Sequence, residues 1–237
     1  MLDDPRFNDD YHIMQRRVVR KLTGESEYES TRASVVPRID NYETDESLCL
    51  TSVVFPPADL GECIKANLIE PLRKFDPDHY YYPAESLHVT VKNVRTIANP
   101  PNFGEEQICA AQSVLQTIVP TFPRFKLILE DLVAFENSAA VVGYSDRTLG
   151  NLILALDSAL RSAGVPDDKQ YVSDSAFFGS MTICRFTSPP SASFVRQLSQ
   201  LSINLDEEFQ VELVKLMICN AVCYAESRRT VGTYNLL

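Results

Sequence analysis

The chain has 237 residues and carries 22 Lys and Arg against 32 Asp and Glu, which gives a formal net charge of −10. Apolar residues make up 45% and charged residues 23%, a composition that is ordinary for a globular protein. An acidic chain is a poor general binder of long nucleic acids. The apolar runs are far shorter than the ~20 residues of a membrane span. The acidic start is unlike an export signal, so we expect a cytoplasmic protein.

The first half of the chain predicts an extension followed by alternating strands and helices. Residues 1–46 are polar and mixed in charge, and we expect an N-terminal extension that is helical around His12 to Leu22 and packs as an arm on the body. The segment 48–55 is rich in β-branched residues and predicts a strand. Apolar residues at helical spacing predict a helix over 59–72. A strand follows over 86–94, and a second helix is expected over 105–119.

The second half repeats this alternation. We expect strands over 124–135, 139–145, 177–187 and 208–226, and helices over 147–164 and 191–201. Asp146 is a typical N-cap for the clearest helix, and Gly164 is expected to end it. Two similar halves of strands and helices predict a two-lobed α+β or α/β fold, which we assign to residues 47–237.

The cysteines and the three histidines lack the close spacing of a structural zinc site. A disulfide framework is also not expected in a chain of this length that begins without an export signal. We therefore expect reduced, mostly buried thiols, no metal and no cofactor. The cysteines are Cys49, Cys63, Cys109, Cys184, Cys219 and Cys223.

The strand SLHVTVK has an informative alternation. Side chains of a strand point to opposite faces in turn, so His88, Thr90 and Lys92 are expected to share the face opposite the core. Histidine moves protons near neutral pH, threonine can donate to a phosphoryl oxygen, and lysine can balance its charge. This set suits an anion, although a surface histidine with ordinary neighbours is the alternative.

A counterpart lies about 90 residues later, in GSMTICRF. Ser180 and Thr182 are expected to share one face of this strand, while Arg185 falls on the opposite phase and would need a bulge to join them. Taken alone, the two residues are equally explained as a hydroxyl pair on a strand.

From about residue 48 onward, the chain resembles the two-histidine phosphoesterase superfamily, the LigT-like 2′-5′ RNA ligases and cyclic phosphodiesterases. The resemblance rests on VVFPPADLGECI near the first strand, on YYYPAESLHVTVKNV around His88, and on GVPDDKQYVSDSAFFGSMTICRF with Arg185. The closing SRRTVGTYNLL, with Tyr234, is similar to the end common in that family. The resemblance implies a bilobal α+β fold, with two pseudo-symmetric lobes of antiparallel sheet plus helices around a central cleft.

The same resemblance implies a metal-free reaction in which two histidines, one from each lobe, act as general base and general acid on a cyclic or 2′,5′ phosphodiester. His88 and Thr90 match the first family motif. In the second motif Thr182 matches, but Ser180 occupies the position of the second histidine. Losing one proton-transfer partner typically removes about 10²–10⁴ of rate.

Three interpretations of Ser180 remain open from the sequence. The protein is a one-histidine hydrolase, or it has kept only a pocket that binds a nucleotide or RNA end, or His12 or His79 enters the cleft. A purely structural scaffold, with no anion in the cleft, is the remaining alternative.

We favour an atypical phosphoesterase that hydrolyses a small cyclic or 2′,5′ phosphodiester. Its partner would be a nucleotide or an RNA end rather than long nucleic acid. The predicted catalytic residues are His88, Thr90, Ser180 and Thr182. The predicted substrate-binding residues are Lys92, Arg185, Tyr82 and Tyr234, although both tyrosines could equally be packing residues.

Overall fold

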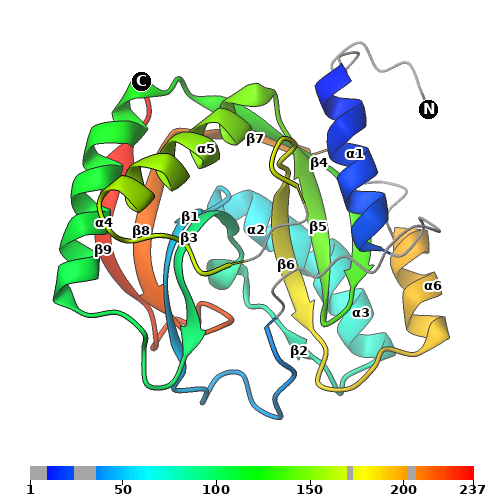
Figure 1. Cartoon of the computed structure of the whole chain (residues 1–237). Helices are drawn as coiled ribbons and strands as arrows, with labels where there is room; N and C mark the ends of the chain where they lie inside the picture. Colours follow the sequence, from blue (N-terminus) through cyan, green and yellow to red (C-terminus); the bar gives the residue numbers. More distant parts are fainter. Residues whose placement is uncertain (1–9, 24–35, 170–172, 202–206) are drawn as a thin grey trace.

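The computed structural model describes residues 10–23, 36–169, 173–201 and 207–237 (Figure 1). The helices are α1 (Asp10–Leu22), α2 (Ala58–Ile64), α3 (Glu70–Phe75), α4 (Glu105–Ile118), α5 (Arg147–Ser162) and α6 (Ala192–Leu201). The strands are β1 (Leu48–Val54), β2 (Tyr80–Tyr81), β3 (Val89–Ala98), β4 (Phe125–Phe135), β5 (Ser138–Tyr144), β6 (Gly179–Arg185), β7 (Glu207–Val211), β8 (Leu213–Cys219) and β9 (Arg229–Asn235).

The strands form one antiparallel sheet that divides into two halves. The order is β7-β4-β5-β6-β3-β1-β8-β9, and β2 pairs with β6. One half therefore contains β6, β5, β4 and β7, and the other contains β3, β1, β8 and β9. The inner strand of each half, β6 or β3, meets the other at the pair Val89–Met181. This arrangement confirms the predicted α+β class with two lobes of antiparallel sheet.

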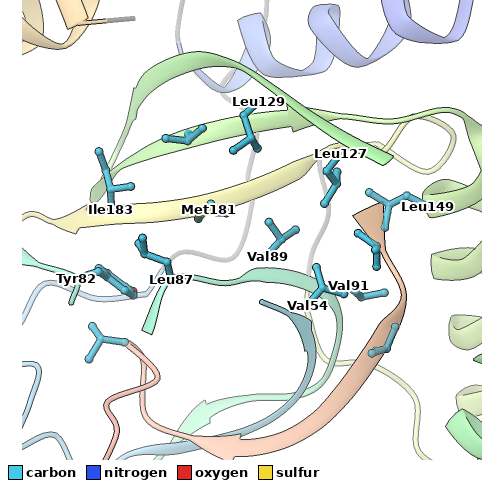
Figure 2. Packing of buried hydrophobic residues seen from close by; sticks show 14 of the residues in the cluster. Val54, Tyr82, Leu87, Val89, Val91, Leu127, Leu129, Leu149, Met181 and Ile183 are labelled. Atoms are coloured by element: carbon cyan, nitrogen blue, oxygen red, sulfur yellow. The ribbon is translucent and has the colours of Figure 1, made fainter. Parts of the chain in front are cut away.

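A large apolar core lies on one face of this junction. Val89 and Met181 are fully buried, and Figure 2 shows them side by side on neighbouring strands, with Leu87 and Ile183 in the same cluster. Helices α4 and α5 pack on each other, α4 contacts β9, and α5 contacts β3. In Figure 1 these two helices cover one end of the sheet, while α1 and α6 lie near its other end.

The clearest predicted helix forms as expected from its end signals. The side chain of Asp146 accepts a hydrogen bond from the Thr148 N–H, which caps α5. Gly164 follows the helix with φ +76°, a left-handed conformation that glycine adopts without strain. The amide of Val165 then donates to the Leu160 carbonyl, so the chain leaves α5 in a fixed direction.

Two predicted elements differ from the structure. The expected helix 59–72 is divided into α2, a π-helical turn (Lys65–Ile69) and α3. Pro71 lies at the start of α3 and has no N–H to continue the ladder, which explains the break. The expected strand 208–226 is wrong in its extent, because β7 and β8 are separate strands and the chain turns after Cys219 before β9 begins.

The N-terminal helix is confirmed and packs on the body. The Gln15 side chain donates to the Phe177 carbonyl, and the Arg16 guanidinium pairs with Glu130. A division of the chain at residue 46 stays a prediction, since part of the extension lies outside the described residues. Within the described part of the chain, no helix is long and apolar enough to cross a membrane.

Candidate functional site

The junction of β3 and β6 carries two short motifs in antiparallel orientation. Because Val89 faces Met181 in the core, the residues on either side of each point to the opposite face of the sheet. His88 and Thr90 therefore flank one side of the pair, and Ser180 and Thr182 flank the other. All four line one cavity of about 150 Å³. The structure thus brings the four predicted catalytic residues together, although it does not test their roles.

A β-bulge follows the threonine in both strands. In β3, Thr90 pairs with Val53 and Lys92 pairs with Ser52, which leaves Val91 as an extra residue. In β6 the corresponding extra residue is Ile183, between Thr182 and Cys184. An extra residue reverses the alternation of every side chain that follows it.

The bulge in β6 turns Arg185 into the cavity. The sequence alternation placed Arg185 on the wrong face unless a bulge intervened, and that condition is met. The guanidinium Nε donates to the Tyr82 hydroxyl at 3.2 Å, and that hydroxyl donates to the Ala221 carbonyl. Arg185 is therefore held by a fixed partner at the cavity wall.

The bulge in β3 turns Lys92 away, so its predicted place beside His88 and Thr90 is wrong. Its side chain is 2% exposed and bonds Asp157 on α5 at 2.7 Å and Asp167 at 2.6 Å. The residue that reaches the cavity is Asn93. The sequence did not predict that Asn93 would line the cavity in place of Lys92, because the alternation of side chains along one strand does not indicate a bulge.

The two predicted tyrosines also lie away from the cavity wall. Tyr82 is 1% exposed and holds Arg185, so stacking on a base is excluded by its burial. Tyr234 lies on β9 and packs partly against the core. Neither lines the cavity. Their contact with a substrate stays a prediction, and the observed side-chain partner of Tyr82 on the cavity wall is Arg185.

His88 has a defined tautomer. Its Nδ1 lies 2.7 Å from the Ser86 carbonyl, and a carbonyl can only accept. Nδ1 therefore carries the proton in the neutral ring, and Nε2 carries the lone pair. An imidazole with its lone pair on Nε2 can accept a proton from a water molecule or a hydroxyl group.

The other two histidines lie elsewhere. His12 packs edge-on against Tyr144, 4.0 Å from Glu130. His79 is buried between Phe186 and Phe194, and this burial lowers its pKa. Among the described residues His88 is the one histidine that lines the cavity, so the expected alternative of a second histidine in the cleft has no support.

Lys169 is a cavity residue that the sequence analysis missed. It follows α5 in the segment GVPDDK, which has no periodicity that assigns it to a face. Burial lowers the pKa of its ammonium, Asp167 raises it, and the nearby cations Arg185 and Lys92 lower it further. The run of charged residues Asp167 to Lys169, separated from Ser180 by ten residues, was the available signal.

The lining has an unusual charge for so acidic a chain. Two cations, Lys169 and Arg185, contribute to it together with His88. No Asp or Glu occurs among the described residues of the wall. The hydroxyl groups that line it come from Thr51, Thr90, Thr96, Ser180 and Thr182. The hydroxyls of Thr96 and Thr51 donate to Asp168 and to the Lys92 carbonyl. The hydroxyls of Thr90, Ser180 and Thr182 lie on the same wall as the two cations, an environment suited to an anion.

The six cysteines are free thiols, as expected, but only three are fully buried. Cys49 and Cys219 line the cavity, with their sulfur atoms 3.8 Å apart. A hydrogen bond from Cys219 lowers the pKa of Cys223 to about 6. Burial of Cys223 raises this pKa, whereas His88 and Arg228 lower it further.

Within the described residues, no cluster of His, Cys, Asp and Glu could hold a metal ion.

Among the comparisons with known proteins, the comparison with solved structures gives matches. No family model matches the sequence, and no curated protein matches it. The fold, however, is similar to E. coli LigT complexed with ATP, with TM-score 0.54, 17% identity, and coverage of 81% of this chain and 99% of that one. LigT complexed with 3′-AMP matches with TM-score 0.52, 18% identity and the same coverage.

A protein of Thermus thermophilus, TT0787, is also similar, with TM-score 0.52 at 13% identity over 80% of this chain and 97% of that one. A structure described as a phosphoesterase matches with TM-score 0.53 at 17% identity, covering 81% of this chain and 99% of that one. These similarities confirm the LigT-like fold that the sequence resemblance implied.

Proposed function

We propose that this protein is a phosphoesterase that hydrolyses a small phosphodiester, either a nucleoside 2′,3′-cyclic phosphate or a 2′,5′-linked oligonucleotide end. The observation that carries the proposal is the cavity wall. In a chain of net charge −10, it combines one histidine, two cations and five hydroxyl side chains with no carboxylate among its described residues.

The reaction needs a base, and His88 is placed to supply it. Its Nδ1 is engaged by the Ser86 carbonyl, so Nε2 is free to take the proton of an attacking water molecule. The water oxygen forms the new bond to phosphorus, and the bond to the ribose oxygen breaks. Removing such a base costs about 10²–10⁴ in rate.

The remaining residues would hold the phosphoryl group. Thr90, Ser180 and Thr182 offer hydroxyl donors to its non-bridging oxygens, and Arg185 balances the developing charge. Tyr82 positions Arg185 through the hydrogen bond to its Nε. The volume of about 150 Å³ is below the ~300–1,000 Å³ of whole-ligand pockets, so the nucleoside would extend beyond the cavity.

The similar proteins support a nucleotide ligand. E. coli LigT was crystallised with ATP and with 3′-AMP, and both ligands carry phosphate on a nucleoside. A cavity that recognises the phosphate and leaves the nucleoside outside is consistent with such ligands.

A binding protein is the second candidate, and Ser180 favours it. A serine hydroxyl has a pKa far above neutrality and cannot replace a histidine as general acid. If no other group supplies the proton, the same cavity would bind a nucleotide without turning it over.

One experiment separates the two candidates. Turnover of nucleoside 2′,3′-cyclic phosphates and 2′,5′-linked dinucleotides is measured in EDTA, for the wild type and for His88→Ala, with His12→Ala as the matched control. We expect metal-independent turnover that His88→Ala reduces at least about 10²-fold and His12→Ala leaves unchanged. Tight binding without turnover would support the binding protein, and the absence of both would refute the site.

A further inference from the structure

The cavity has a base but no obvious acid. Hydrolysis of a ribose phosphodiester leaves an alkoxide, which needs a proton as the bond to phosphorus breaks. Across the Val89–Met181 pair, His88 faces the motif that contains Ser180 and Thr182. The hydroxyl groups of these two residues do not ionise near neutral pH. If the protein is a hydrolase, the proton comes from water or from another side chain on the cavity wall.

Two cations line the wall, and only one of them can transfer a proton. A guanidinium group, as in Arg185, does not give up a proton in proteins and cannot act as a general acid. The ammonium of Lys169 can lose a proton, and burial makes the pKa of lysine readily adjustable. Chemistry therefore selects Lys169 from the residues at hand.

The segment that carries Lys169 is fixed to the motif strand β3 by its two preceding residues. Asp167 accepts from the buried Lys92 ammonium at 2.6 Å. Asp168 accepts from the Thr96 amide and the Thr96 hydroxyl, both at 2.9 Å. Asp167 also accepts from the Lys169 amide at 2.7 Å. These contacts hold the backbone of Lys169 beside the strand that carries Thr90.

We propose that Lys169 is the second proton-transfer residue of this cavity, donating to the leaving oxygen while His88 Nε2 accepts the proton of the attacking water. This inference rests on the proposed function. One P–O bond forms to water and one breaks to the ribose oxygen. The donated proton stays on the ribose hydroxyl of the product. Before the next turnover, His88 releases its extra proton to solvent and Lys169 takes up a proton from solvent.

The surroundings of Lys169 lower the pKa of its ammonium from the usual value of lysine. Among the described residues, the charged and titratable groups that influence it include Asp167 on its own segment, Arg185 on β6, Lys92 on β3 and Cys49 on β1. Burial is the largest influence and lowers the pKa of the ammonium, and the two cations act in the same direction. Asp167 opposes them, because its carboxylate favours the charged ammonium.

The leaving group tests this role. A nucleoside 2′,3′-cyclic phosphate releases an alkoxide that needs a proton, whereas a 4-nitrophenyl phosphodiester of the same nucleotide releases a phenolate that does not. We expect Lys169→Met and Lys169→Arg each to reduce turnover of the cyclic phosphate by about 10²–10⁴. On the nitrophenyl ester, we expect Lys169→Arg to retain activity within about tenfold of wild type.

The pH profile gives a second signature. In the wild type, kcat on the cyclic phosphate should fall on the alkaline side as the Lys169 ammonium loses its proton, and this limb should be absent in Lys169→Arg. Lys74→Met, an exposed lysine on α3, is the matched control and should leave the profile unchanged.

Three outcomes decide the matter. Loss of turnover of the cyclic phosphate in both Lys169 variants, with turnover of the nitrophenyl ester retained by Lys169→Arg, supports a proton donor. If Lys169→Arg keeps full activity on the cyclic phosphate, or Lys169→Met does, the inference is wrong while the proposed function stands. If the wild type turns over neither ester, the proposed function fails and the inference fails with it. Thermal unfolding of each variant separates loss of folding from loss of chemistry.

Discussion

The two inner strands, β3 and β6, are near copies in geometry and differ in chemistry. Each carries a motif of alternating polar residues around the Val89–Met181 pair, and each has a bulge directly after its threonine. Each then turns a polar residue, Asn93 or Arg185, into the cavity three positions beyond that threonine. The shared backbone geometry explains why both motifs reach one small cavity.

The differences lie in what the copies carry. The first strand presents the imidazole of His88, and the second presents the hydroxyl of Ser180. The first buries Lys92 two positions after its threonine, and the second buries Cys184 at the corresponding place. The comparison teaches that two strands with similar backbone geometry can present different side chains, a histidine in one motif and a serine in the other. Lys169 would then restore the balance from outside the two motifs.

The largest expected effect is on the free energy of unfolding, and it distinguishes buried Lys92 on β3 from buried Cys184 on β6. Lys92→Met leaves the Asp167 carboxylate buried without its ammonium partner, and breaking such a pair typically costs about 3–5 kcal/mol of the free energy of unfolding. Cys184→Ala, the matched change on β6, should cost only about 1 kcal/mol, because it removes one small buried group. Denaturant unfolding measures both. Equal losses would contradict the assigned role of the ion pair.

A change at Ser180 tests the chemical asymmetry. In the Lys169→Met background, Ser180→His places an imidazole at the position of the second motif that corresponds to His88 in the first. We expect it to recover about 10²-fold of the lost turnover of a nucleoside 2′,3′-cyclic phosphate, because a proton donor returns to the cavity. The same change in the wild type should gain much less. A double variant that stays as slow as Lys169→Met would refute the equivalence of the two sites.

The two threonines test the geometric symmetry. Thr90→Val and Thr182→Val each remove one hydroxyl donor and preserve the shape of the side chain. A hydrogen bond to a charged group contributes about 1.5 kcal/mol or more, so each change should weaken binding of a nucleoside monophosphate about tenfold. Isothermal titration measures both affinities. A loss confined to one threonine would show that the phosphate sits in only one lobe.

The smallest expected effect is on the pH dependence of stability and comes from His79, which, unlike His88, does not line the cavity. Burial holds the pKa of His79 below its usual 6.5 in the folded protein. Between these two pKa values the unfolded chain binds more protons, so the free energy of unfolding should decrease as the pH falls below about 6.5. His79→Phe should remove this part of the pH dependence and leave turnover intact. An unchanged pH dependence would exclude His79 as its source.

The sequence predicted the site where its pattern is local. Alternation placed His88, Thr90, Ser180 and Thr182 on one face because each motif spans only three residues on one side of a bulge. It failed at Lys92, two residues later, because the register shift at Val91 reverses the face. Bulges arise from pairing with neighbouring strands, and this information is not contained in the alternation of a single strand.

Residues placed by long-range contacts were the hardest to predict. Tyr82 reaches Arg185 across 103 positions of the chain, and Lys92 reaches Asp167 across 75. Lys169 lies in an irregular segment, where no period assigns a face, and its position follows from those distant bonds. The helix ends at Asp146 and Gly164 were predictable because capping depends on neighbours within one turn.

The most direct test of the site is a crystal structure of the protein with a nucleoside 2′-monophosphate, a product of the proposed reaction. We expect the phosphate to lie over the Val89–Met181 pair, within hydrogen-bonding distance of Thr90 and Thr182 and of the His88 Nε2. A nucleotide bound elsewhere on the protein, with the cavity left empty, would contradict the assignment of this cavity as the phosphoesterase site.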